Sequence, residues 1–203
     1  VVVLGSGVGG THATHIAVGM GADVWVIDRS PEVIEAHWQQ FGRSTNPVFS
    51  TRDALERHVL EADLVIGGVL IPGAAAPKLV TAEMVSAMKP GSVIVDVAID
   101  QGGCCETSRP TTHAEPTYVV DDVVHYCVAN MPGGVPRTST FALNNVTLPH
   151  ILALADNGYR VALEQDPHLC KGLNVHAGKV TCLELAKDLG YEYVDPSTAL
   201  TGG

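Results

Sequence analysis

Short runs of apolar and β-branched residues recur along the first two thirds of the chain, separated by segments whose apolar residues have helical spacing. Near-continuous apolar runs are typical of strands in a parallel sheet that is covered on both faces. The predicted strands are residues 1–4, 24–27, 64–66, 93–97 and 123–128, with a weaker one at 48–50. The predicted helices are residues 9–20, 31–41, 53–60 and 82–88. This alternation predicts an α/β fold built on a doubly wound parallel sheet.

The pattern changes after about Met131. A loop rich in Pro and Gly leads into a long helical stretch, residues 138–157, in which Pro149 is expected to kink or break the helix. Two shorter helical segments are predicted near residues 160–169 and 180–189, without further alternation of strand and helix. We therefore expect a domain at residues 1–135 and a helical segment at residues 136–203 that packs on something else.

The composition argues against several classes of protein. Of the 203 residues, 46% are hydrophobic and 17% are charged, which is too apolar for a disordered chain. The most apolar stretch, residues 64–76, is interrupted by Gly67, Gly68, Pro72 and Gly73, so no membrane span is expected. The net charge of −10 would repel a nucleic-acid backbone and argues against a nucleic-acid partner.

The five cysteines form neither a CxxC pair nor an even set, which favours free thiols in a reducing cytoplasm over a disulfide scaffold or a zinc ribbon. We expect Cys104 and Cys105 to be two free thiols beside a substrate cleft rather than a vicinal disulfide. The nine histidines show no convincing metal-ligand spacing, so no metal is expected. His12 and His15 are interpreted as surface or packing residues. Five other histidines are expected to be solvated: His37, His58, His150, His168 and His176.

The first residue is Val rather than Met, and the chain begins inside a predicted strand. On this ground we expect that the chain was cut from a longer one or lacks its leading part. Such a segment would be able to hold part of the active site.

A glycine-rich turn follows the first predicted strand. Gly5, Gly7 and Gly10 satisfy the pattern G-x-G-x-x-G between a strand and a helix, which is the context in which this pattern binds a dinucleotide. In that role the glycines permit a tight turn, an approach of the backbone to the pyrophosphate and close packing of helix on strand. Asp28 ends the second predicted strand, at the distance expected for the acid that binds a ribose diol. The alternative is a glycine-rich turn with a surface Asp.

Asp28 also bears on the choice of cofactor. A carboxylate at this position would repel a 2′-phosphate and favours NAD over NADP, whereas the adjacent Arg29 could accept that phosphate. We therefore expect a Rossmann-type domain that binds NAD.

Asp100 and Asn130 each follow a predicted strand. In open α/β sheets, ligands lie beyond the carboxyl ends of the strands. Asp100 is therefore either a reacting group or a turn residue that binds local backbone N–H groups. Asn130 either orients a substrate or the nicotinamide carboxamide, or caps a loop. The residues themselves leave both pairs of alternatives open.

Longer stretches of the sequence resemble one particular protein family. Residues 88–96 read MKPGSVIVD and residues 98–104 read AIDQGGC. These strings closely resemble bacterial alanine dehydrogenases, and so do residues 69–74, 76–80, 108–113, 126–133 and 136–140. The resemblance covers essentially the whole chain. The soluble NAD-binding subunit of proton-translocating transhydrogenase shares the glycine turn and parts of these strings.

The resemblance implies a role for each candidate residue. The glycine turn would hold the pyrophosphate and Asp28 the adenosine ribose. Ser50 and Val69 would line the adenine side, and Val128, Asn130 and Met131 would flank the nicotinamide and the substrate. Asp100 would lie at the nicotinamide end of the cofactor and act in proton transfer.

At the level of function, the resemblance implies a cytoplasmic, hexameric enzyme that oxidises L-alanine with NAD to pyruvate, ammonium and NADH, reversibly. The family also uses a Lys, a His and an Arg from an amino-terminal substrate domain that this sequence does not contain. We therefore expect the chain alone to bind NAD but to turn over alanine poorly. Two alternatives remain: a dinucleotide-binding module for redox sensing or assembly, without catalysis, and a transhydrogenase subunit.

Overall fold

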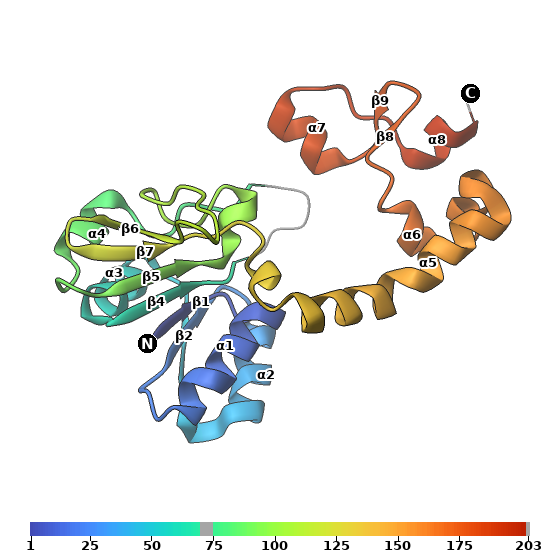
Figure 1. Ribbon diagram of the computed structural model, residues 1–203. Helices are drawn as coiled ribbons and strands as arrows, with labels where there is room; N and C mark the ends of the chain where they lie inside the picture. Colours follow the sequence, from blue (N-terminus) through green and yellow to red (C-terminus); the bar gives the residue numbers. More distant parts are fainter. Residues whose placement is uncertain (70–74, 202–203) are drawn as a thin grey trace. The chain divides into compact units, whose positions relative to one another are not determined.

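The computed structural model describes residues 1–69 and 75–201 (Figure 1). Residues 70–74, which belong to the string at 69–74 noted above, lie outside the described residues. The chain forms two structural units. The amino-terminal unit ends at Met131, and the carboxyl-terminal unit begins at Pro132.

A seven-stranded sheet organises the amino-terminal unit, in the order β3-β2-β1-β4-β5-β7-β6. Its neighbouring strands are parallel, except for the antiparallel pair β6 and β7. The strands are β1 Val2–Leu4, β2 Trp25–Asp28, β3 Asn46–Phe49, β4 Leu64–Gly67, β5 Val93–Asp96, β6 Thr117–Val120 and β7 Val123–Tyr126. The order reverses at β1, which lies between β2 and β4, as in a doubly wound sheet. The predicted α/β fold is confirmed.

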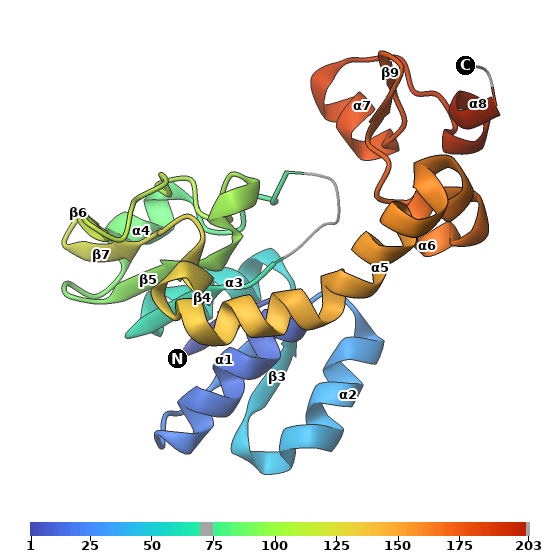
Figure 2. The same cartoon turned by 45° about the vertical axis from the view of Figure 1, so that its right-hand side comes forward.

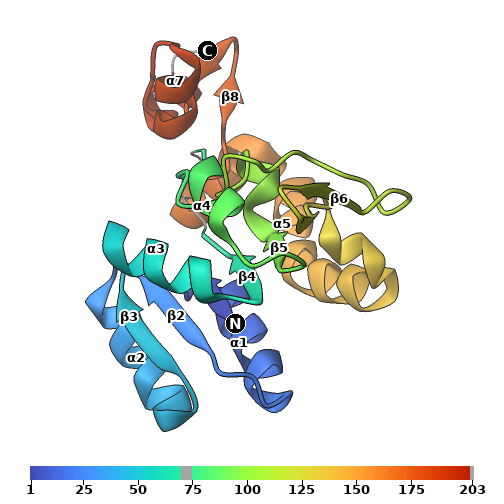
Figure 3. The same cartoon turned by 90° about the vertical axis from the view of Figure 1, so that its left-hand side faces the viewer.

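Four helices connect the parallel strands and cover both faces of the sheet (Figure 3). They are α1 Val8–Gly19, α2 Pro31–Phe41, α3 Arg52–Glu61 and α4 Ala82–Ala87. Val3 packs in a buried cluster with Ala17 of α1, whereas Val2 and Leu4 pack in a second cluster with side chains of α3 and α4. The two clusters lie on opposite faces because successive side chains of a strand point in opposite directions.

The two edge strands of the sheet, β3 and β6, were predicted weakly or not at all from the sequence. The weakly predicted strand is β3, which tolerates Pro47 because it lies at the edge of the sheet. Strand β6 lies outside the predicted elements. Asp121 and Asp122 join it to β7 in a two-residue turn with φ values of 47° and 61°. Such turns usually carry Asn-Gly or Asp-Gly, so an Asp-Asp pair is a poor signal in the sequence.

The carboxyl-terminal unit is helical with one small hairpin (Figure 2). Its elements are α5 Pro136–Gln165, α6 Pro167–Cys170, β8 Val175–His176, β9 Lys179–Val180, α7 Leu183–Leu189 and α8 Pro196–Thr201. Pro149 was expected to kink or break this helix, but the break in α5 lies at Gly158, which has φ 73° and ψ 155°. The segment predicted as a helix from residue 180 begins with β9 instead, and α7 starts at Leu183.

None of the helices formed by residues 1–69 and 75–201 combines the length and the apolar character needed to cross a bilayer.

Candidate functional site

A cleft opens at the carboxyl ends of β1, β2 and β4, on either side of the reversal in strand order. Its volume is about 220 Å³. Five of the predicted cofactor-binding residues line it: Gly5, Gly7, Asp28, Ser50 and Val69. The remaining lining residues are Ile27, Arg29, Gly68, Pro77 and Leu79. The sheet brings these positions together because parallel strands end at one shared edge.

The glycine turn is built so that side chains are excluded at two of its three signature positions. Gly5 has a φ of 86°, and a Cβ there would lie 3.1 Å from the backbone of Gly68. A Cβ on Gly10 would lie 1.8 Å from the carbonyl oxygen of Gly5, so the helix packs directly on the strand. A Cβ on Gly7 would meet no described atom within 4 Å. Protein packing therefore explains Gly5 and Gly10, whereas Gly7 leaves open space for the approach of a ligand.

Asp28 is held in place by the backbone on both sides. Its Oδ2 accepts a hydrogen bond from the Ser6 N–H at 2.8 Å, and its Oδ1 accepts one from the Ser30 N–H at 2.9 Å. The first bond ties the end of β2 to the glycine turn. Arg29, which is exposed, lines the same cleft.

A buried histidine contacts a residue of the glycine turn. The Nδ1 atom of His37 lies 2.8 Å from the Ser6 hydroxyl oxygen, and only 3% of the His37 surface is exposed. Burial lowers the pKa of His37, and nearby His15 lowers it further, against a smaller opposing effect of Asp28. The neutral imidazole is therefore the favoured form.

The expectation that His37 and His58 are solvated is wrong. His58 is buried as well, and its ring stacks on Trp25 at 4.1 Å between centroids. Helical periodicity could have placed both residues on the inner faces of their helices, but a histidine there is a weak signal because it is common on either face.

The residues predicted for the nicotinamide end come after β5 and β7, which are parallel neighbours. Asp100 is exposed in the short 3-10 helix Val97–Gln101 that follows β5. Val128 is fully buried, whereas Asn130 is exposed with a φ of 57°, and its carbonyl oxygen lies 3.0 Å from His113 Nε2. Together with Met131 they lie at the same edge of the sheet as the cleft but outside its lining.

Comparisons with known proteins identify the family. The model of the "Alanine dehydrogenase/PNT, C-terminal domain" family matches residues 1–183. The chain belongs to this family. An alanine dehydrogenase of Halomonas elongata is 59% identical over 200 residues, which are 98% of this chain and 54% of that protein. A solved L-alanine dehydrogenase structure is 50% identical with a TM-score of 0.82, over 93% of this chain and 52% of that one.

Transhydrogenases share the fold of this alanine dehydrogenase/PNT domain at lower identity. The crystal structure of a transhydrogenase from Sinorhizobium meliloti is 33% identical with a TM-score of 0.60, over 69% of this chain and 40% of that one. The resemblance to alanine dehydrogenases seen in the strings is thus confirmed. The chain spans about half the length of the curated relatives it matches.

The cysteines of this family member are free thiols, but the expectation that Cys104 and Cys105 lie beside a cleft is wrong because both are fully buried. With Asp96 they bring three possible metal-ligand atoms within 4.8 Å, the one such group among the residues that the structure describes. Contact with the Cys105 thiol and burial raise the pKa of Cys104. The cluster was not foreseen because Asp96 lies in a strand that otherwise reads as apolar.

Proposed function

We propose that this chain supplies the cofactor-binding part of an NAD-dependent alanine dehydrogenase. The reaction converts L-alanine, NAD and water to pyruvate, ammonium, NADH and a proton, and it is reversible. The observation that carries the proposal is the cleft at the strand ends, lined by Gly5, Gly7 and Asp28, in a chain 59% identical to an alanine dehydrogenase.

Each lining group has a role in holding the dinucleotide. The amino end of α1 directs backbone N–H groups and a partial positive charge at the pyrophosphate, and the open space at Gly7 allows the close approach. Asp28 accepts hydrogen bonds from the adenosine ribose. Ser50 and Val69 line the adenine side. Val128, Asn130 and Met131 flank the nicotinamide and the substrate.

Asp28 selects NAD rather than NADP. Its carboxylate is fixed by two backbone N–H groups and cannot easily swing away from a 2′-phosphate. The resulting repulsion outweighs Arg29, which is exposed and carries its charge on a long, mobile side chain.

Asp100 exchanges the protons of the reaction. The bound dinucleotide supplies the hydride acceptor. Loss of hydride from the amine-bearing carbon gives an imine, to which water adds before ammonium leaves, and each stage needs a group that takes or returns a proton. The exposed carboxylate of Asp100, at the tip of β5, is within reach of solvent for this exchange.

The remaining parts of the proposal concern the whole protein. Residues 1–135 form the NAD-binding domain, and residues 136–203 belong to a substrate domain supplied by the part of the relatives that this chain does not cover. The complete enzyme acts in the cytoplasm as a homohexamer on alanine, pyruvate and ammonium. The transhydrogenase alternative is less favoured because the likeness falls to 33% identity.

The cofactor assignment is tested by titrating the 203-residue chain with NADH and with NADPH, followed by fluorescence or calorimetry. We expect the unmodified chain to prefer NADH. Asp28→Asn should weaken NADH binding by about 10- to 150-fold, because a hydrogen bond to a charged group contributes about 1.5–3 kcal/mol. Asp23→Asn, at the opposite end of β2, is the matched control. Equal NADH affinity of the Asp28→Asn variant and the unmodified chain would contradict the assignment.

The catalytic assignment is tested after joining the chain to the part of the Halomonas elongata alanine dehydrogenase that it does not cover. Alanine-dependent NADH formation is followed by absorbance. Asp100→Asn should reduce kcat by about 10²- to 10⁴-fold, the usual contribution of a general acid or base, and leave NADH binding intact. Transhydrogenation between NADH and an NADP analogue without deamination would instead favour the alternative.

A further inference from the structure

The loop that carries Asp100 is tied to the core by a buried carboxylate. Asp96, the last residue of β5, is fully buried. Its Oδ2 accepts hydrogen bonds from the N–H groups of Cys104 at 2.8 Å and Cys105 at 3.2 Å, and from the Ser108 hydroxyl at 2.6 Å. These bonds close the excursion of the chain from residue 96 to residue 104, and Asp100 lies in the middle of it.

Two glycines leave the space that this carboxylate occupies. A Cβ on Gly103 would lie 2.8 Å from Asp96 Oδ2, and a Cβ on Gly67 would lie 3.2 Å from Oδ1 and 2.3 Å from the Cys104 sulfur. Oδ1 has no hydrogen-bond partner among the described residues. A buried carboxylate with one unsatisfied oxygen is costly. An apolar residue of similar size would fill this space at a lower cost in free energy. The carboxylate of Asp96 therefore indicates a role other than stability.

A lysine binds the same loop from the solvent side. Lys78 Nζ donates to the carbonyl oxygens of Gly102 at 2.6 Å, Gly103 at 2.9 Å and Cys105 at 3.1 Å. Asp96 thus accepts hydrogen bonds from N–H groups of the turn on its inner side, and Lys78 donates hydrogen bonds to carbonyl groups of the turn on its outer side. Opposite charges on the two sides fix both the position and the direction of the peptide units.

We propose that Asp96 and Lys78 form a loop clamp that positions Asp100 for proton transfer. Both are positioning residues, since they act on the loop and not on the reacting atoms. This inference rests on the proposed function for the role of Asp100, but the clamp itself does not. With the end of β5 on one side and the clamped turn at residues 102–105 on the other, the short 3-10 helix between them has little freedom.

The clamp is tested first without any catalysis, by amide hydrogen exchange of the 203-residue chain. Asp96→Asn keeps the size of the side chain but removes its charge, and Lys78→Met removes the cation. We expect exchange at the Cys104 and Cys105 amides to accelerate about 10-fold or more in Asp96→Asn, and to accelerate also in Lys78→Met. Lys78→Arg keeps the donor and should retain most of the protection.

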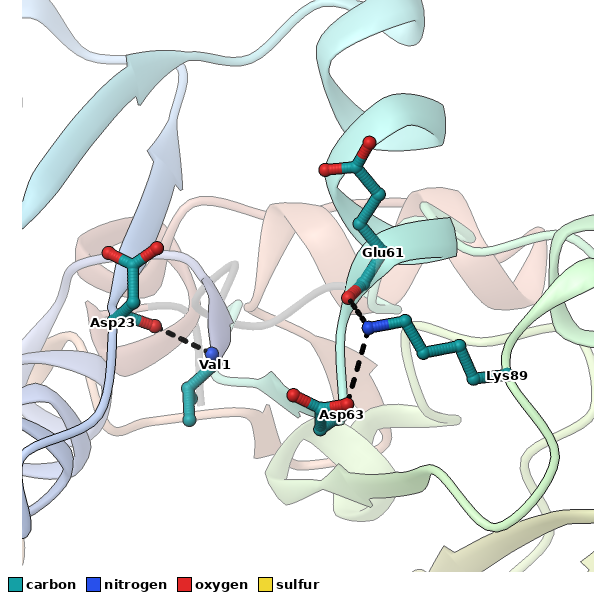
Figure 4. A network of polar contacts seen from close by, with 5 residues as sticks. All are labelled: Val1, Asp23, Glu61, Asp63 and Lys89. Atoms are coloured by element: carbon teal, nitrogen blue, oxygen red, sulfur yellow. Dashed lines mark hydrogen bonds and ion pairs between the residues drawn. The ribbon is translucent and has the colours of Figure 1, made fainter.

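Lys89→Met is the matched control for Lys78→Met. Lys89 is also a largely exposed lysine that donates to a backbone carbonyl, that of Glu61 at 2.6 Å, and it contacts Asp63 (Figure 4). It lies at the opposite, amino-terminal ends of the strands, beside β4 and β5. Exchange at residues 104 and 105 should not change in this variant. Unchanged exchange in both Asp96→Asn and Lys78→Met would overturn the clamp, and Lys78→Met keeps the test decisive if Asp96→Asn fails to fold.

Positioning is tested in the joined protein described above. We expect both clamp variants to lower kcat about 10- to 100-fold, as for a catalytic group displaced by about 1 Å, with NADH affinity unchanged within about 2-fold. Accelerated exchange with unchanged kcat, in a protein that Asp100→Asn inactivates, would overturn the positioning role. A joined protein that oxidises no alanine, or whose Asp100→Asn variant is fully active, would count against the proposed function, while the exchange data still decide the clamp.

Discussion

Gly10 is the residue at which backbone packing is tightest in the glycine turn. Its hypothetical Cβ would overlap the Gly5 carbonyl oxygen at 1.8 Å, and backbone cannot move aside as a flexible side chain can. The neighbouring Gly9 has no described atom within 4 Å of the same position. The two adjacent glycines therefore have different physical requirements.

Gly10→Ala should destabilise the chain by about 1–3 kcal/mol, as overpacking does, and should also abolish NADH binding because α1 must shift away from β1. Gly9→Ala should leave the free energy of unfolding unchanged or slightly higher. Urea denaturation measures both. If the Gly10→Ala chain were as stable as the Gly9→Ala chain, the close approach of α1 to β1 at Gly10 would be contradicted.

His37 and His125 are buried histidines whose pKa is lowered mainly by burial. A base with a lowered pKa in the folded state binds fewer protons there than in the unfolded state. Its stabilising contribution is therefore complete above the unfolded pKa, near pH 6.5, and is lost as the pH falls below it.

We expect the free energy of unfolding to fall below pH 6.5 by up to about 1.4 kcal/mol per pH unit for each of these histidines. His37→Asn should flatten this dependence, whereas His12→Gln, an exposed residue of α1, should not. Denaturation at a series of pH values is the measurement. A profile that is the same for His37→Asn and the unmodified chain would rule out His37 as a source.

At the scale of elements, α5 shows which helix breaker acts. Pro149 sits inside the helix without leaving helical geometry, whereas Gly158 takes φ 73° and ψ 155°. The latter region is essentially closed to residues with a Cβ. Proline is the more obvious helix breaker in the sequence, but α5 is interrupted at a backbone conformation that only glycine adopts readily.

Gly158→Ala should destabilise the carboxyl-terminal unit by about 1–3 kcal/mol. Pro149→Ala restores a backbone N–H and should stabilise α5, by up to about 3 kcal/mol. Hydrogen exchange along α5 separates the two effects from changes in the amino-terminal unit. Equal protection in the Gly158→Ala and unmodified chains would contradict the observed break.

At the scale of the whole molecule, the chain spans about half of its curated relatives and contains the cleft proposed above for a dinucleotide within its amino-terminal unit. We expect the 203-residue chain to bind NADH but to form no measurable NADH from alanine. Joining it to the rest of the Halomonas elongata enzyme should restore turnover. Substantial alanine oxidation by the chain alone, measured by absorbance, would refute this division of roles.

The sequence by itself determined the parallel strands, the helices α1 to α4 and the glycine turn, because these follow from local periods and from residues that are close in the chain. The fold class, Gly5, Gly7, Gly10 and Asp28 could all be identified in this way. The edge strand β6 was beyond that reasoning because its Asp121-Asp122 turn is atypical. The break in α5 was beyond it because a glycine within a helical pattern does not show which φ and ψ it will adopt.

Only the tertiary structure decided which distant residues support the site. His37 meets Ser6 across 31 positions, and Lys78 meets Gly102 across 24. No period in the sequence encodes these contacts. They depend on which strands become neighbours in the sheet and on how each loop returns across its edge, and both are set by the packing of the whole unit.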